Sequence, residues 1–256
     1  MNQPYDAPVG GNRPGTVEND VQLVDTVLRP VRGHMAFESC VEQLGSAIQL
    51  GVFRAGSKLP NERELAERLN VSRATLREAI SALRAAGFVT TSRGRGGGTV
   101  VEPIENMRRL EPIELVDGQV EMDDIVTFRS IVEPGACYYA ASHPMDAVAR
   151  ELLTTRLSEV KAARTPSAYR QADARLHLTI ASVCGSAELS KSCSVVQTRI
   201  HQYLDEIPFL LKNIENSDEQ HRLIVNAILT GDADTARAVM EEHCAATAAL
   251  LKGLHT

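Results

Sequence analysis

The second half of the sequence, from Glu121 onward, carries only helical hydrophobic patterns. Its apolar residues recur three or four positions apart, which is the spacing of one face of an α-helix. Turn signals divide the stretch at His143-Pro144, Thr165-Pro166, Gly185-Ser186 and Ile207-Pro208. The predicted helices are 122–141, which Pro134 kinks or divides, 145–162, 166–183, 187–205, 208–230 and 233–252. With no strand pattern between them, these helices predict an all-α bundle of roughly six to seven helices.

The preceding segment has a different pattern, in which short helices are followed by two short strands. A helix is expected over 36–50, where Gly51 ends it, and two more over 61–69 and 72–86. Asn61 and Ser72 are suitable N-caps, and Asn70-Val71 forms the tight turn between the two. The stretches FVTTS and GTVVEP are typical of strands, and a loop of glycine and arginine joins them. The fold class is therefore mainly α, with an N-terminal winged helix-turn-helix and a C-terminal all-α bundle.

Composition and the positions of turn-forming residues predict four segments along the chain. A flexible N-terminal tail covers 1–33, which is rich in Gly, Pro, Asn and Asp and holds at most a helical turn near Val21–Leu28. The winged helix-turn-helix occupies 34–103, a linker 104–120, and the helical domain 121–252.

Charge is distributed unevenly over these segments. Between Ala36 and Val101 nine Lys or Arg residues face six acids, so this part carries +3 and the remainder −9 of the overall −6. A basic module on an acidic body indicates a polyanionic partner for the first part only. No apolar run reaches the ~20 residues of a membrane span, and no secretion signal is visible at the N-terminus. The five scattered cysteines, with no CxxC, are expected to be reduced thiols in a cytoplasmic protein.

The second helix of a helix-turn-helix lies in the major groove with its first residues at the base edges. Arg73 and Arg77 share one face here, and Thr75 lies beside them, so the arginines can bind guanine while threonine reaches phosphate or a thymine methyl. The supporting helix offers its free N-terminus to phosphate, and a wing arginine can enter a minor groove. The predicted DNA-contacting residues are Asn61, Glu62, Arg63, Ser72, Arg73, Thr75, Arg77, Arg93 and Arg95. Alternatively, Arg73 and Arg77 form ion pairs with Glu62, Glu64 or Glu78 on solvated helices.

Four ligand-type residues in the helical domain have spacings that can close one metal site. Asp173 and His177 lie four residues apart, one turn along a helix. His221 and His243 flank the turn signal Gly231-Asp232 at similar distances, so two antiparallel helices would place them at one level, roughly 15–17 Å from the turn. Three imidazoles and a carboxylate suit zinc or nickel, and manganese is a further candidate. Such a site is compatible with a chemical sensor or with an enzyme.

The segment GVFRAGSKLPNERELAERLNVSRATLREAISALRAAGFV, followed by RGRGGGTVV, closely resembles the winged helix-turn-helix of GntR-family bacterial transcription regulators. By this resemblance Arg63, Arg73, Thr75, Arg77, Arg93 and Gly94 fall where family members contact operator DNA. The helical part resembles the FCD effector domain of the FadR subfamily, through FRSIVE, the DxxxH of Asp173 and His177, and HRxIxxAIxxGDxxxA followed by His243. The sequence departs from the DxxFH motif at Leu176, and from the Asn usual soon after it within Cys184-Gly185-Ser186.

The FCD resemblance implies a metal ion on these four residues and an effector that is a small carboxylate or sugar acid. Arg129 is then the expected second anchor of the effector, unless it forms a structural ion pair with Glu133, and His201 is a further polar wall. The resemblance implies a homodimer bound to a near-palindromic operator, and repression that ends when the effector binds. The alternatives are a metal-dependent hydrolase, or an effector-independent DNA-binding protein with a structural metal.

Overall fold

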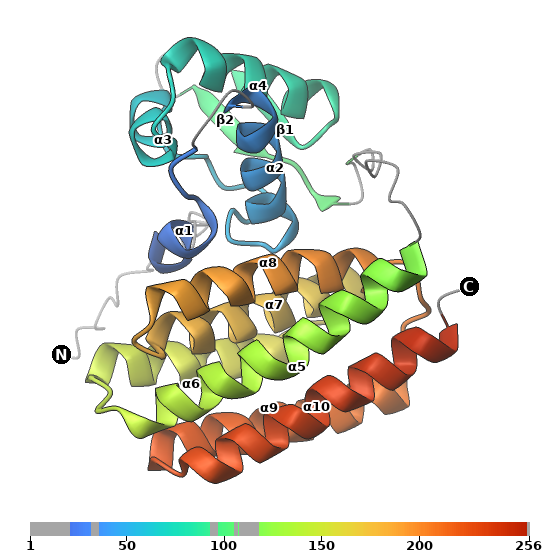
Figure 1. Ribbon diagram of the computed structural model, residues 1–256. Helices are drawn as coiled ribbons and strands as arrows, with labels where there is room; N and C mark the ends of the chain where they lie inside the picture. Colours follow the sequence, from blue (N-terminus) through green and yellow to red (C-terminus); the bar gives the residue numbers. More distant parts are fainter. Residues whose placement is uncertain (1–20, 32–35, 93–96, 105–106, 108–117, 255–256) are drawn as a thin grey trace, which may run out of the picture.

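The computed structural model consists of a small mixed module stacked on a layer of long helices (Figure 1). It describes residues 21–31, 36–92, 97–104, 107 and 118–254. Among these residues, no helix has the length and apolar character needed to cross a membrane.

The upper module is a winged helix-turn-helix. Helices α2 (Ala36–Gln49), α3 (Glu62–Leu69) and α4 (Arg73–Ala85) precede strands β1 (Val89–Ser92) and β2 (Gly98–Val101). The strands pair antiparallel, with Val89 opposite Val101. Asn61 and Ser72 cap the two short helices through their side-chain oxygens, and Asn70 adopts the left-handed conformation (φ 53°) that the tight turn requires. The predicted order of elements is confirmed here.

Six helices form the lower domain. They are α5 (Gly118–Ser142), α6 (Ala147–Ala162), α7 (Pro166–Val183), α8 (Ala187–Leu204), α9 (Leu211–Thr230) and α10 (Ala233–Leu254). Helix α5 continues through Pro134. The sequence predicts that this proline either kinks the helix or divides it, and the helix is not divided. Packing of α5 against α8 and α10 outweighs the one backbone hydrogen bond that proline removes. The all-α bundle predicted from the sequence is confirmed.

Helix α1 (Val21–Val27) lies where the sequence predicts a flexible tail. Leu23, Val24, Val27 and Leu28 are nearly inaccessible to solvent and belong to the core of the upper module. The Val31 amide donates to the Leu69 carbonyl at 2.7 Å, which fixes the chain after this helix. The difference arises because α1 is too short to be stable alone and depends on packing against the folded domains.

Helix α7 belongs to both layers of the molecule. Ala174 and Leu178 are fully buried in the core of the upper module. On the same side, the Gln171 side chain donates to the carbonyls of Ile48 and Gln49 at 3.3 and 3.2 Å. The bundle is therefore attached to the end of α2 through α7.

Candidate metal site and nucleic-acid interface

Three buried histidines from three helices face one another inside the bundle. His177 comes from α7, His221 from α9 and His243 from α10. Gly231, in the left-handed conformation, ends α9 and lets α10 return alongside it, which brings His221 and His243 to one level as the spacing predicts. Their ring centroids are 4.7 Å apart, and one nitrogen from each of the three rings lies within 4.8 Å of the others.

The distances within this group fit a tetrahedral metal ion. The Nε2 atoms of His177 and His221 are 3.3 Å apart. Two imidazole nitrogens bound to one zinc at about 2.05 Å in a tetrahedron are separated by about 3.3 Å. Asp173 Oδ1 lies 3.2 Å from the same Nε2 of His221. The structure thus places the three histidines in one cluster and the fourth predicted ligand beside one of them.

The electrostatics at His221 and His243 favour the neutral imidazole, which is the form that binds metal. Burial lowers the pKa of His221 to about 4. Burial, together with the rings of His221 and His177, holds the pKa of His243 well below its usual value. The second ring nitrogen of His243 donates to Gln220 Oε1 at 3.2 Å, which directs the other nitrogen toward the cluster. The donor set therefore fits a divalent ion held by three histidines and a carboxylate.

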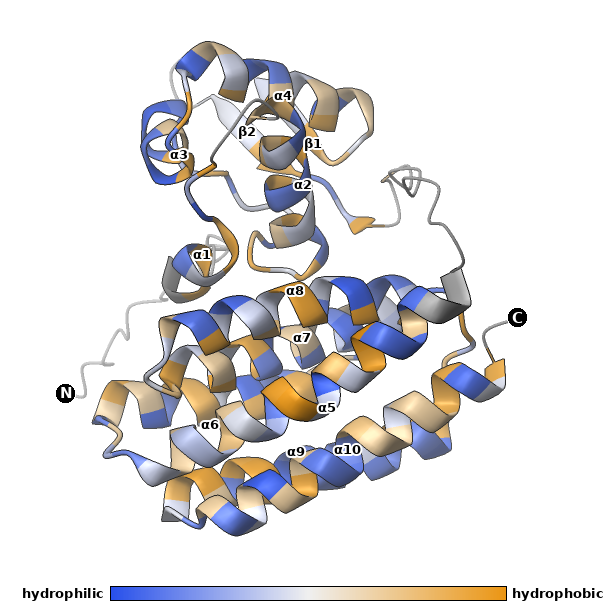
Figure 2. Cartoon of the chain, viewed as in Figure 1, coloured by the Kyte–Doolittle hydropathy of each residue, from blue (hydrophilic) through white to orange (hydrophobic). Residues whose placement is uncertain are grey.

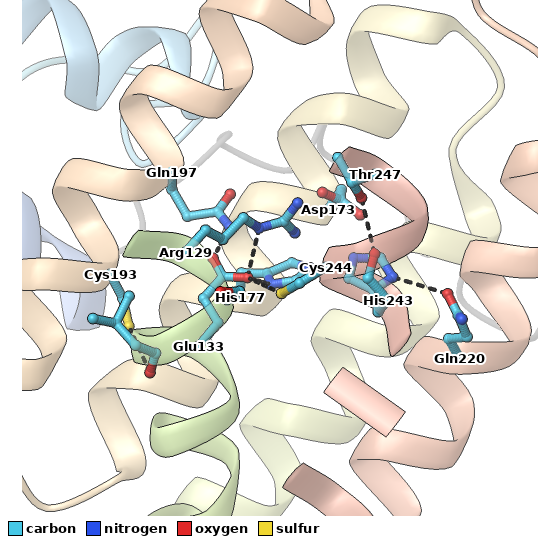
Figure 3. A network of polar contacts seen from close by, with 12 residues as sticks. Arg129, Glu133, Asp173, His177, Cys193, Gln197, Gln220, His243, Cys244 and Thr247 are labelled. Atoms are coloured by element: carbon cyan, nitrogen blue, oxygen red, sulfur yellow. Dashed lines mark hydrogen bonds and ion pairs between the residues drawn. The ribbon is translucent and has the colours of Figure 1, made fainter. Parts of the chain in front are cut away.

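Glu133 is the buried centre of the polar network around the site, and its role beyond pairing with Arg129 is not predicted from the sequence (Figure 3). Its Oε2 lies 2.9 Å from Arg129 Nε and 3.1 Å from His177 Nδ1, and its Oε1 accepts from Gln197. Burial acts to raise the pKa of Glu133, but Arg129 and His177 outweigh burial and hold that pKa well below its usual range. The carboxylate thereby orients His177 so that Nε2 faces the cluster.

Arg129 forms the ion pair with Glu133 that was one of its two expected roles. Its Nε is paired with Glu133, and its guanidinium points toward Asp173 and Thr247 (Figure 3). Its Nη1 is buried without a hydrogen-bond partner among the described residues. Arg129, Asp173 and His243 line an inner pocket of about 50 Å³, which has room for roughly three to five water molecules. The pocket therefore brings a guanidinium, a carboxylate and an imidazole around one small space.

His201 occupies a different position from the one expected. It is 6 % exposed and lines a cavity between the two domains, whereas Arg129 lines the inner pocket beside the histidine cluster. His201 Nε2 lies 2.7 Å from the carbonyl of Arg170, which borders both spaces. Helical position alone did not show on which side of α8 this ring lies.

The predicted DNA-contacting residues gather around the start of α3 and α4. Asn61, Arg63, Ser72 and Arg73 are exposed there. Asn61 and Ser72 are occupied as helix caps, and Ser72 also contacts the Thr75 hydroxyl at 2.9 Å.

The arginines of this surface differ in their partners. Arg77 pairs with Glu62 at 2.7 Å, as the ion-pairing alternative predicts for this arginine. Arg63 pairs with Glu67 at 3.3 Å. Within the described part of the chain, Arg73 has no ion pair. Arg93, Gly94 and Arg95 of the wing lie outside the described residues.

A winged helix-turn-helix with an exposed second helix, joined to a separate helical domain that holds a buried cluster of ligand-type residues, is the architecture of a DNA-binding transcription regulator with an effector domain. Residues 38–101 match the family described as bacterial regulatory proteins, gntR family, and residues 124–246 match the FCD domain. The chain belongs to the GntR family and carries an FCD domain. It is a transcription regulator and not an enzyme, so the hydrolase alternative falls away.

Several curated relatives are similar over most of this chain. An HTH-type transcriptional regulator described as RmpR, of Mycobacterium gastri, is 30% identical over 80% of this chain and 76% of its own length. A protein of Escherichia coli (strain K12) described as an L-lactate dehydrogenase operon regulatory protein is 31% identical over 74% of this chain and 76% of its own. The solved structure of E. coli McbR/YncC covers 86% of this chain and 99% of its own at 18% identity, with a TM-score of 0.53, which shows a shared fold.

Proposed function

We propose that this regulator is a repressor whose operator affinity is controlled by a small carboxylate bound at a divalent metal ion, zinc in the first place. Asp173, His177, His221 and His243 would hold the ion. The observation that carries the proposal is that His243 of the histidine cluster, Asp173 and the Arg129 guanidinium border one inner pocket. A metal supplies a Lewis-acidic position for one carboxylate oxygen, and Arg129 offers a charge-assisted hydrogen bond to the acid.

Release from DNA would follow because α7 contacts both the ligand site and the DNA-binding module. Asp173 and His177 lie on its ligand side, while Gln171 and Leu178 contact the DNA-binding module. An effector that binds one arrangement of α7 more tightly than another shifts the population of module orientations. The similarity to a regulator named for an L-lactate dehydrogenase operon makes L-lactate the first acid to test, followed by sugar acids.

The variant His221→Ala tests the metal and effector site. We expect zinc affinity to fall at least tenfold, since one of four ligands is lost, and the response of DNA binding to carboxylates to disappear. Operator affinity without effector should be unchanged. Metal content is measured by elemental analysis, and DNA affinity by fluorescence anisotropy on a site selected from genomic fragments.

His143→Ala is the matched control, because this histidine is exposed and lies at the end of α5. A purely structural metal would be indicated if chelation unfolded the helices of the wild type. The effector proposal would be abandoned if His221→Ala lost zinc but still released DNA in response to the acids.

We propose further that the protein is a homodimer joined through the α5 and α8 face. Hydrophobic residues recur along α5 in Figure 2. Phe128, Ile131 and Tyr139 on α5, and Val195 on α8, are 39%, 67%, 51% and 43% exposed. A row of large apolar residues on two packed helices is typical of an interface with a second subunit. A dimer would present two recognition helices to the half-sites of a near-palindromic operator.

Ile131→Glu is expected to convert the dimer to a monomer in size-exclusion chromatography with light scattering, because the variant places a carboxylate in the apolar row. Operator affinity should fall with it. Val148→Glu is the matched control, since Val148 on α6 is 61% exposed but lies outside this row. A dimer that survives Ile131→Glu would place the interface elsewhere.

A further inference from the structure

A second cavity, of about 330 Å³, lies between the DNA-binding module and the helical domain. Leu50 and Phe88 of the module, with Ile104 and Met107 after β2, form one wall, and residues of α7 and α8 form the other. Ligand sites occur preferentially at such domain interfaces, and their volumes begin at about 300 Å³. A cavity of about 150 Å³ already accepts benzene, so this one has room for a substituted ring.

The two walls are firmly attached to each other. Beside the cavity, Arg175 Nη1 approaches the Gly51 carbonyl at 3.5 Å, and Gln171 donates to two carbonyls of the module. Gly51 has φ +69°, and a Cβ at this position would lie 2.5 Å from Arg175 Nη1. Only glycine permits this approach without a shift, so the two walls fit closely beside the cavity.

His201, which lines the cavity from α8, carries an unused hydrogen-bond acceptor. Its Nε2 lies 2.7 Å from the Arg170 carbonyl, and a carbonyl can only accept, so Nε2 carries the proton. Burial lowers the pKa of His201, which keeps the ring neutral and leaves Nδ1 unprotonated. Nδ1 is buried and has no hydrogen-bond partner among the described residues. A buried acceptor without a donor is costly, and a bound hydroxyl would satisfy it.

The two charged residues that border the cavity, Arg170 and Asp205, neutralise each other. Arg170 Nε lies 3.4 Å from Asp205 Oδ1, and both residues border the cavity. Thr198 and Gln202, which also border the cavity, are uncharged. An ionised ligand would have no unpaired counter-charge among these residues, so a neutral ligand is favoured.

We propose that this cavity is a second ligand site, which binds a small uncharged phenol. The ring would pack against Leu50, Phe88 and Met107, where aromatic and sulfur contacts favour it, and the hydroxyl would donate to His201 Nδ1. The site does not depend on the metal. Since Arg170 borders this cavity and also the inner pocket, a phenol bound here is placed to alter how the module sits on α7.

Binding is tested with 4-fluorophenol as the probe, observed by ¹⁹F NMR on the full-length protein. We expect broadening and a saturable shift of the probe signal, and about tenfold weaker binding of fluorobenzene, which has no hydroxyl. Chelation should leave the phenol affinity unchanged, whereas a loss on chelation would assign the probe to the metal site and overturn the proposal.

Thr198→Phe fills the cavity and should weaken phenol binding at least tenfold. Thr154→Phe is the matched control, because both threonine hydroxyls bond the carbonyl four residues earlier and Thr154 is exposed on α6. His201→Phe should bring the affinity for 4-fluorophenol down to that for fluorobenzene; thermal melts check that each variant is folded. Absence of binding, equal affinity for the two probes, or insensitivity to Thr198→Phe would each refute the site.

Discussion

Replacing Arg73 by alanine is expected to lower operator affinity about a hundredfold without destabilising the fold. Arg73 is exposed in the first turn of α4 and has no ion pair within the described chain. A bidentate contact from arginine to guanine contributes about 1–3 kcal/mol, and the proposed dimer would make the contact twice. A hundredfold change corresponds to about 2.7 kcal/mol, which lies inside that range.

Fluorescence anisotropy at one fixed moderate salt concentration measures this effect, because phosphate contacts make any affinity salt-dependent. Arg84→Ala is the matched control, since Arg84 lies in the last turn of the same helix and contacts Ser81. Arg77→Ala should cost less than Arg73→Ala, because Arg77 must first leave its ion pair with Glu62. Specific binding that survives Arg73→Ala would remove α4 from the recognition surface.

Local signals predict the helices of the bundle well. Helix α7 begins and ends at the predicted residues because Thr165 caps it, Pro166 occupies its first turn and Gly185 follows it. Helix α1 has no such signals, and its order comes from burial of Leu23 and Val24 against distant parts of the chain. Hydrophobic periodicity carries no information about contacts between residues that are far apart in the sequence.

The candidate site is likewise predictable from the sequence only in part. The histidine cluster follows from helical spacing and one glycine turn, so the sequence predicts it. The contacts of Glu133 with Gln197 and His177 join three helices, and only the i,i+4 relation to Arg129 is visible in sequence. The ring of His201 lies between the domains because of how α8 is rotated, and rotation is set by tertiary packing.

Glu133→Ala is expected to lower the free energy of unfolding of the chelated protein by about 3–5 kcal/mol, measured by denaturant titration. The substitution leaves the Arg129 guanidinium, which is 3% exposed, buried without its counter-charge. It should also weaken zinc binding by about 10- to 100-fold, because His177 loses the carboxylate that orients it. The two effects have different causes, so a second variant can separate them.

The double variant Arg129→Met/Glu133→Met removes both buried charges together. Stability should return to near the wild-type value, since a buried ion pair is often replaced by apolar residues of similar volume without loss. Zinc affinity should stay low, because no carboxylate lies beside His177 Nδ1 in this variant. If zinc affinity returned together with stability, Glu133 would serve only to neutralise Arg129, and the orientation of His177 would have another source.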